Sequence, residues 1–422
     1  MIVLDILSVI LFVMFVLTFS QRLVYYVVRF TGIKKTWTAK RQCKYAVMIA
    51  ARNEENVVPH LIDSIKRQEY PQELIDIYVV ADNCTDSTAE VCRRCGARVF
   101  ERFDSEHKSK GYALQYLYRQ IREELPGDYY DGYFVFDADN LLDPKYISAM
   151  NDVFSNDKRV VIGYRTAKNF EGNWISASYG IFFLTESECC NRPRDILNTS
   201  CFLSGTGCLF SSALLEEHGG WVWTGLTEDL ECTSTLVSEG EKIAYCADAI
   251  LYDEQPTGLK ISIQQRTRWI KGYLHAIYIN RKGLFRRLFK PGWFAAHDLL
   301  MDMGPFVSFV VNLVVNIVRT SILVATGAAS LTSILTGILG ALLMVYGLLY
   351  LMGILTIIAE WKRIPLPWWK KILYSFMYSI FMCTFFISYF MTLFRTPEWK
   401  HIPHSVSKSI DEMDLTATKK GT

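Results

Sequence analysis

The sequence lacks a marked excess of either charge, since 45 Lys and Arg residues face 43 Asp and Glu residues and the net charge is only +2. Nucleic-acid-binding proteins usually carry a clear basic excess, so this balance argues against nucleic acid as a partner. The cysteines also lack zinc-site spacing, because the Cys92/Cys95 pair has no regularly spaced second pair in Cys189 and Cys190. We therefore interpret the cysteines as small apolar residues of the core.

The first apolar segment lacks the features of a cleaved signal peptide. Residues 2–19 are almost wholly apolar, with Asp5 the only charge, and no small-x-small cleavage site follows clearly. Basic residues come after this segment, from Arg29 to Lys44, without an acidic residue among them. By the positive-inside rule this pattern predicts a transmembrane helix over residues 1–28, followed by a cytoplasmic domain.

Long apolar runs return late in the chain, at residues 306–326, 331–358 and 372–394. Each approaches or exceeds the roughly 20 residues that a helix needs to cross a bilayer. The block over 40–290 has mixed polarity and reads as a water-facing domain that ends in interface helices. We therefore expect a multi-pass protein of the plasma membrane, with membrane helices over 291–395 and a cytosolic tail over 396–422. A cytosolic tail requires residues 372–394 to lie in the interface or to turn back, and the alternative is that they cross and place the tail outside.

The water-facing block alternates short apolar runs with helical patterns. The runs that suit buried strands lie at residues 45–51, 75–81, 97–102 and 133–136. Strand–helix–strand alternation of this kind predicts an α/β fold with a mostly parallel sheet.

Acidic residues follow three of the expected strands. Glu54 follows the first, Asp82 the second, and Asp137 and Asp139 the fourth, and ligands bind beyond the carboxyl ends of strands in such sheets. Two carboxylates one residue apart can both turn toward a hard cation that also holds a diphosphate. The alternative is that these side chains only cap helices.

Two further motifs suit a phosphorylated donor and an acceptor hydroxyl. Lys110 lies beside Gly111 at an expected helix start, which suits an anionic ligand, although a solvated loop has the same composition. In Thr227-Glu-Asp229, Thr227 is suited to cap a helix, whereas Asp229 is suited to accept the proton of an attacking hydroxyl as a general base.

The order of these motifs resembles the membrane-embedded inverting glycosyltransferases of family 2, which include the cellulose, chitin and hyaluronan synthases. The resemblance is carried by Ala51-Arg-Asn-Glu54, Asp82, Lys110-Gly111, Asp137-Ala-Asp139, Ser204-Gly-Thr-Gly207, Thr227-Glu-Asp229 and Gln265-Arg-Thr-Arg-Trp269. It implies a Rossmann-like GT-A fold with a mostly parallel sheet, together with a helical transmembrane region.

The resemblance also implies a role for individual residues. The implied nucleotide-sugar site comprises Ala51, Glu54, Asp82, Lys110, Asp137, Ala138, Gln265 and Arg268. The implied acceptor site comprises Phe202, Gly205, Thr206 and Trp269. Asp229, with Glu228 beside it, would be the catalytic base, and Asp137 and Asp139 would hold Mg²⁺ or Mn²⁺. Trp399 and His404 resemble a loop that closes over the donor, while Arg266 has no assigned role and is expected to face lipid.

The implied function is a processive synthase that extends a β-linked polysaccharide and passes it into the membrane. UDP-glucose is the favoured donor and the growing glycan the acceptor, which gives a cellulose-like or mixed-linkage β-glucan. A chitin-type, poly-N-acetylglucosamine or hyaluronan synthase is one alternative, and a non-processive enzyme with a lipid-linked acceptor is another. The sequence has few apolar segments, so one chain would supply few helices to enclose a pore for the polysaccharide. A homo-oligomer, in which a second protomer supplies more helices, stays an open alternative.

Overall fold

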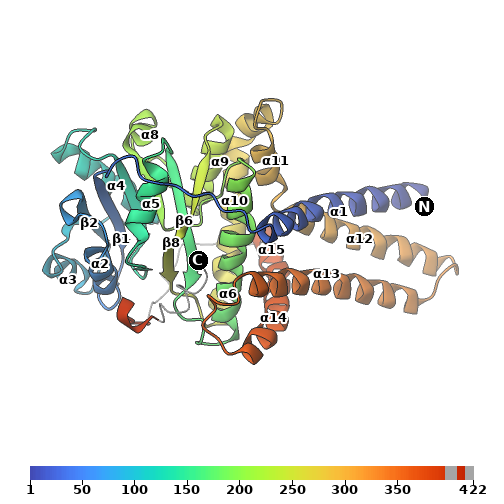
Figure 1. Cartoon of the computed structure of the whole chain (residues 1–422). Helices are drawn as coiled ribbons and strands as arrows, with labels where there is room; N and C mark the ends of the chain where they lie inside the picture. Colours follow the sequence, from blue (N-terminus) through green and yellow to red (C-terminus); the bar gives the residue numbers. More distant parts are fainter. Residues whose placement is uncertain (395–405, 414–422) are drawn as a thin grey trace.

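The computed structural model describes residues 1–394 and 406–413, which form an α/β domain and a group of long apolar helices that project from it (Figure 1). Eight strands of the described chain form one sheet in the order β3-β2-β1-β4-β7-β6-β8-β5. Their bounds are β1 (Tyr45–Ala51), β2 (Ile75–Asp82), β3 (Arg98–Arg102), β4 (Gly132–Asp137), β5 (Leu141–Leu142), β6 (Val160–Ala167), β7 (Cys208–Ser211) and β8 (Ile243–Asp253).

The sheet is mostly parallel, which confirms the predicted fold class. Strand β1 pairs in parallel with β2 and β4, β2 with β3, and β6 with β8. Strand β7 runs antiparallel between β4 and β6, and β5 runs antiparallel to β8. Helices cover both faces, so the central strands are buried on both sides and read as continuous apolar runs.

The domain helices are α2 (Val58–Lys66), α3 (Thr88–Arg94), α4 (Lys110–Glu124), α5 (Tyr146–Phe154), α6 (Trp174–Leu184), α7 (Arg192–Ile196), α8 (Ser212–Glu217), α9 (Glu228–Glu239) and α10 (Leu259–Arg287). Shorter helical turns are η1 (Gln72–Leu74), the π-helix η2 (Thr185–Asn191) and η3 (Ile410–Glu412).

Strand β1 shows how the sheet divides the core into two layers. Met48 belongs to the same buried cluster as Leu114 of α4, whereas Val47 belongs to the cluster of Leu61 of α2. Alternate side chains of a strand point to opposite faces, so a single strand supplies both layers. Full burial of one such side chain stabilises the fold by about 1.5–3 kcal/mol.

The start of α4 requires glycine for a packing reason. A Cβ at Gly111 would lie 2.3 Å from the carbonyl oxygen of Trp223, which leaves no room for any other residue. Gly111 therefore lets the first turn of α4 approach the loop before α9, and this approach positions the neighbouring Lys110.

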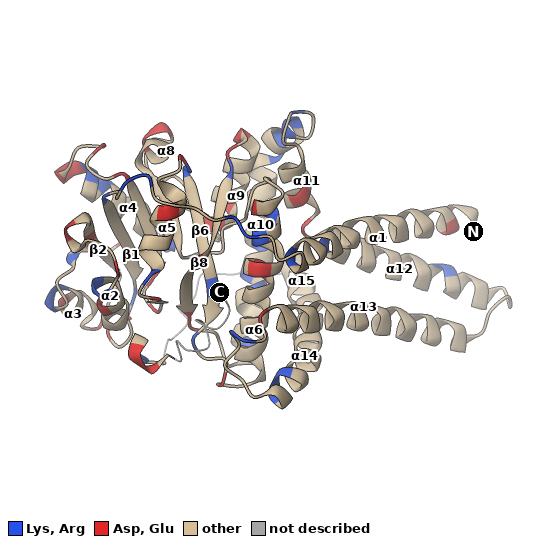
Figure 2. Ribbon diagram, viewed as in Figure 1, with Lys and Arg blue, Asp and Glu red and all other residues tan. Residues whose placement is uncertain are grey.

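Four helical segments of the described chain are long and apolar enough to cross a membrane: α1 (Ile2–Phe30), α12 (Gly304–Ala325), α13 (Leu331–Ala359) and Trp368–Phe394. Helices α1, α12 and α13 run together away from the domain, and charged residues are sparse along them (Figures 1 and 2). The fourth segment is broken at Thr384 into α14 (Trp368–Cys383) and α15 (Phe385–Phe394). These two helices lie across the base of the bundle, where α14 packs on α6 and α15 on α10.

Buried ion pairs join the projecting helices to the domain. Arg29 at the end of α1 lies 3.0 Å from Glu188 of η2 and 2.6 Å from Glu360, which directly follows α13. Arg194 of α7 lies 2.7 Å from Asp298 of α11 (Phe294–Met301). Breaking a buried pair of this kind costs several kcal/mol, so these pairs hold α1, the end of α13 and α11 against the domain.

The described part of the tail lies against the α/β domain. The backbone N–H of Val406 donates to Glu254 at 3.2 Å, and Arg67 of α2 pairs with Asp411 at 2.6 Å. The described tail residues therefore contact the α/β domain, although they follow α15 in the chain.

Candidate active site

One cavity of about 530 Å³ begins at the carboxyl ends of the strands and extends between α1, α12, α13 and α15. Most of the residues predicted from the sequence for the donor, acceptor and catalytic sites line it together. They are Ala51, Glu54, Asp82, Lys110, Asp137, Ala138, Asp139, Phe202, Gly205, Glu228, Asp229, Gln265, Arg268 and Trp269.

Parallel pairing brings the strand-end carboxylates to one edge of the sheet. Ala50 of β1 aligns with Val80 of β2 and with Asp137 of β4, so the three strands end at the same level. Asp82, which ends β2, is buried and lies 2.6 Å from the Arg102 guanidinium. A buried carboxylate of this kind needs such a partner, because an unpaired charge is costly to bury.

Lys110 is the central cation of this edge. Its ammonium lies 2.5 Å from the Asp137 carboxylate and 3.6 Å from Glu228, and it donates to the carbonyl oxygen of Gly205 at 2.6 Å. Burial alone would lower the pKa of Lys110, but the charges of Asp137 and Glu228 outweigh burial and raise it. Lys110 therefore stays positively charged and links the β4 end to the start of α9.

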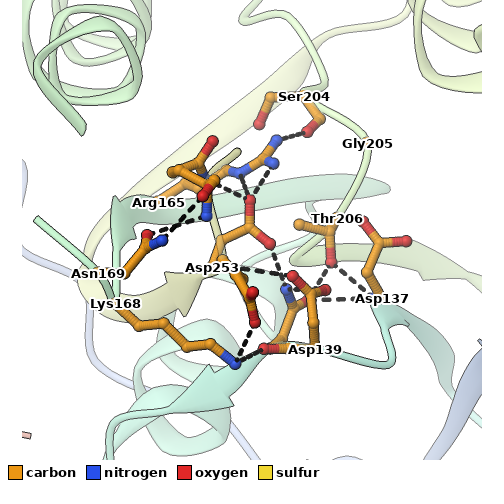
Figure 3. A network of polar contacts seen from close by, with 12 residues as sticks. Asp137, Asp139, Arg165, Lys168, Asn169, Ser204, Gly205, Thr206 and Asp253 are labelled. Atoms are coloured by element: carbon orange, nitrogen blue, oxygen red, sulfur yellow. Dashed lines mark hydrogen bonds and ion pairs between the residues drawn. The ribbon is translucent and has the colours of Figure 1, made fainter. Parts of the chain in front are cut away.

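Asp139 lies in a polar network that the sequence analysis did not predict (Figure 3). Lys168 donates to the backbone carbonyl of Asp139 at 2.9 Å, and the backbone N–H of Glu254 donates to its carboxylate at 3.1 Å. The Nε of Arg165 donates to Asp253 at 3.0 Å. Asp253 and Glu254 follow a strand just as Asp82 does, so the same signal was present in the sequence.

The carboxylate oxygens of Asp137 and Asp139 are suited to bind a divalent ion together with a phosphate-bearing ligand. Both carboxylates line the cavity, and Lys110 occupies one oxygen of Asp137. The described residues contain no group of three or more potential metal ligands. Mg²⁺ is commonly held by one or two carboxylates plus substrate phosphates and waters, so two protein carboxylates suffice for such a site.

Asp229 lies in the first turn of α9 and faces the cavity. The backbone N–H of Leu230 donates to its carboxylate at 2.9 Å, and a Cβ placed on Gly205 would lie 3.6 Å from its other oxygen. Burial, reinforced by the charge of Glu228, raises the pKa of Asp229 to about 7. A carboxylate with this pKa is suited to accept a proton near neutral pH.

Helix α10 places three of its predicted residues on the cavity wall. The side-chain carbonyl oxygen of Gln265 is buried and has no hydrogen-bond partner among the described residues. Arg268 donates to the carbonyl oxygen of Leu226 at 3.3 Å. The Trp269 ring lies 6.1 Å from Phe182 in a stacked arrangement. An indole held this way offers an apolar face and a polar edge to a ligand.

Arg266 does not face lipid, so the expectation for this residue is wrong. Its side chain is completely buried, and its guanidinium donates to the carbonyl oxygen of Phe381 at 3.0 Å and to the Thr384 hydroxyl at 2.7 Å. It also lies over the Phe381 and Phe385 rings, with centroid distances of 4.2 and 4.6 Å. Arg266 therefore fastens α10 to the break between α14 and α15.

One described residue of the predicted site, Thr206, does not line the cavity. Thr206 is buried, and its hydroxyl contacts Asn140 and accepts the Asp137 backbone N–H, so it supports the β4 end from behind. Trp399 and His404 lie outside the described residues.

Comparison with known families settles the family. A model described as "Glycosyltransferase like family 2" matches residues 42–272, which is more than half of the chain. The chain belongs to this family. Its Rossmann-like sheet is shared with the mannosyltransferase PcManGT from Pyrobaculum calidifontis, solved in complex with GDP-Man and Mn²⁺. That match has a TM-score of 0.55 and 17% identity, and it covers 84% of this chain and 98% of the other.

Curated relatives differ in the products for which they are named. The chain is 25% identical over 257 residues to a beta-monoglucosyldiacylglycerol synthase of Nostoc, covering 56% of this chain and 52% of the relative. It is 23% identical over 233 residues to a poly-beta-1,6-N-acetyl-D-glucosamine synthase of Staphylococcus aureus, covering 53% of each. The chain thus spans about half the length of these relatives.

Proposed function

We propose that this protein is a membrane-bound hexosyltransferase that transfers a sugar, with inversion, from a nucleoside diphosphate to an acceptor arriving from the membrane side. The observation that carries the proposal is the shared cavity. It joins the Lys110–Asp137 pair, the Asp229 carboxylate and the membrane helices in one continuous space. A donor and an acceptor can therefore meet at Asp229.

The strand-end edge is the proposed donor site. Glu54 and Asp82 offer buried carboxylates to the hydroxyls and ring N–H groups of a nucleoside, uridine being the favoured one. Lys110 and Arg268 supply positive charge for the diphosphate, and Gln265, whose side-chain oxygen has no partner among the described residues, lies on the same wall. Mg²⁺ or Mn²⁺ held at Asp137 and Asp139 would neutralise charge on the leaving diphosphate.

Asp229 is the proposed general base. As the acceptor oxygen forms its bond to the anomeric carbon, the bond between that carbon and the diphosphate oxygen breaks, and the acceptor proton passes to Asp229. Attack on the face opposite the diphosphate converts an α-linked donor into a β-linked product. Trp269 and Phe202 would hold the acceptor against this carboxylate, since both line the same cavity.

Two more specific proposals concern the side of the membrane on which the domain lies and the identity of the product. The basic residues that follow α1 favour a domain in the cytoplasm, with the nucleotide sugar supplied there. A processive β-glucan synthase using UDP-glucose is a second candidate, favoured by the Gln265-to-Trp269 motif and its aromatic wall. The curated relatives include a lipid-product enzyme and a polymer enzyme by name, so they leave the acceptor open.

The test is transfer by the purified full-length protein with UDP-glucose, UDP-N-acetylglucosamine and UDP-glucuronate in turn. UDP release and labelled product are measured with Mg²⁺ or Mn²⁺ and a membrane-lipid extract. Asp229→Asn should lower turnover by about 10²- to 10⁴-fold, because it removes the proton acceptor, and should leave UDP binding intact. The exposed Asp128→Asn serves as the control. Unchanged turnover in Asp229→Asn would remove Asp229 as the base.

A further inference from the structure

The membrane end of the cavity is apolar. Beyond Arg22 its walls are formed by Phe15 and Phe19 of α1, Phe309 of α12, and Val345, Leu348 and Leu349 of α13. None of these six side chains carries a hydrogen-bonding group. Phe19 and Phe15 lie one to two turns beyond Arg22, roughly 5–10 Å farther along α1. This end therefore lies between three of the helices long and apolar enough to cross a membrane.

These walls are unsuited to a polysaccharide. A buried hydroxyl without a hydrogen-bond partner costs about 1–3 kcal/mol, and each hexose carries several hydroxyls. At the far end the buried Phe15 and Phe309 rings lie 6.2 Å apart and pack in one apolar cluster with Val345. An acyl chain needs no hydrogen bonds and gains from apolar contact.

A charged zone separates the apolar end from the strand ends. Arg22 of α1 pairs with Asp302, and Glu186 of the π-helix η2 lines the cavity beside them. The neighbouring Arg194 is already matched by Asp298 at 2.7 Å. Arg22 and Arg194 are thus each matched by a carboxylate, and burial raises the pKa of Glu186, which favours its uncharged form. Because both guanidinium groups are already matched, the zone offers little to a lipid phosphate and suits an uncharged, hydroxyl-bearing head.

We propose that the acceptor is a neutral, hydroxyl-bearing membrane lipid, with its acyl portion in the apolar end and its free hydroxyl at Asp229. This inference rests on the proposed glycosyl transfer. The lipid oxygen forms the bond to the anomeric carbon, the nucleoside diphosphate leaves with the electron pair of the broken bond, and Asp229 takes the hydroxyl proton. The products are a β-linked glycolipid and the nucleoside diphosphate.

The test compares acceptors and two matched tryptophan variants of α13. The full-length protein receives the active nucleotide sugar with dioleoylglycerol, dihexanoylglycerol, a polyprenyl phosphate or a cello-oligosaccharide. Leu348→Trp fills the apolar end, whereas Leu351→Trp adds the same bulk to the exposed side of the same helix. We expect transfer to dioleoylglycerol in the parent protein, and a fall in its kcat/KM of about tenfold or more in Leu348→Trp only.

The short-chain lipid separates a blocked acyl site from general damage. Transfer to dihexanoylglycerol should change less than about threefold in Leu348→Trp, because its short chains fill much less of the apolar end than oleoyl chains do. Preference of the parent protein for the polyprenyl phosphate or the oligosaccharide would overturn the inference, as would equal losses for both glycerolipids. Metal-dependent UDP binding is measured in parallel. If UDP binds but no neutral lipid is glycosylated, only this inference fails, and if UDP does not bind, the proposed function fails with it.

Discussion

The two ends of the cavity are built from different parts of the chain. At the strand ends, carboxylates lie at or just after the ends of β1, β2, β4 and β8, and cations from β3 and α4 pair with Asp82 and Asp137. At the membrane end, apolar side chains come from α1, α12 and α13. The family match covers residues 42–272, so it includes the first set and excludes the second. Donor chemistry can therefore be shared across the family while the choice of acceptor varies.

The largest expected effect comes from a substitution in the polar end of the cavity alone. Asp139→Asn removes one of the two carboxylates that line the cavity after β4, and we expect transfer to fall by about 10²-fold or more. Metal-dependent UDP binding should weaken in the same variant, and chelation of divalent ions should reproduce the loss in the parent protein. The temperature of unfolding should stay within a few degrees of the parent, since the apolar core is untouched. Full activity with metal-independent UDP binding would show that Asp139 has no part in the donor site.

A second test acts outside the cavity wall, at the contact between α10 and the break between α14 and α15. Arg266→Ala leaves the Phe381 carbonyl and the Thr384 hydroxyl without their donor, and it also removes ring contacts from a completely buried site. We expect a loss of about 2–4 kcal/mol in the free energy of unfolding, seen as a lower unfolding temperature in detergent. Arg281→Ala, at an exposed position on the same helix, is the matched control and should change little.

A lysine at position 266 would sharpen the stability comparison. Arg266→Lys keeps the charge but lacks the planar fork that reaches both acceptors, so it should restore only part of the lost stability. A variant as stable as the parent would mean that α14 and α15 are held to α10 by other contacts.

The sequence predicted the polar end better than the membrane end for a physical reason. A strand end can be recognised from a short stretch of sequence, because an apolar run is followed there by a carboxylate. Parallel pairing of β1, β2 and β4 then brings Glu54, Asp82 and Asp137 to one edge of the sheet. The burial of Arg266 depends on Phe381, 115 residues away, and nothing near Arg266 in the sequence records that contact. The apolar end likewise depends on how α1, α12 and α13 converge. Asp253 and Glu254 were missed although their strand carries the same local mark.

The smallest expected effect concerns the pKa of Asp229, the proposed general base. Burial and the neighbouring Glu228 together raise the pKa of Asp229 to about 7. Only the carboxylate accepts a proton, so kcat/KM should rise with pH through a value near this pKa. Glu228→Gln removes a negative charge, which favours the ionised form of Asp229, lowers its pKa and moves the rising limb to lower pH by about one unit or less. Glu239→Gln, at the other end of α9, should leave the limb in place. A limb that stays fixed in Glu228→Gln would mean that burial alone sets the pKa of the base, and a shift to higher pH would show that some group other than Asp229 titrates.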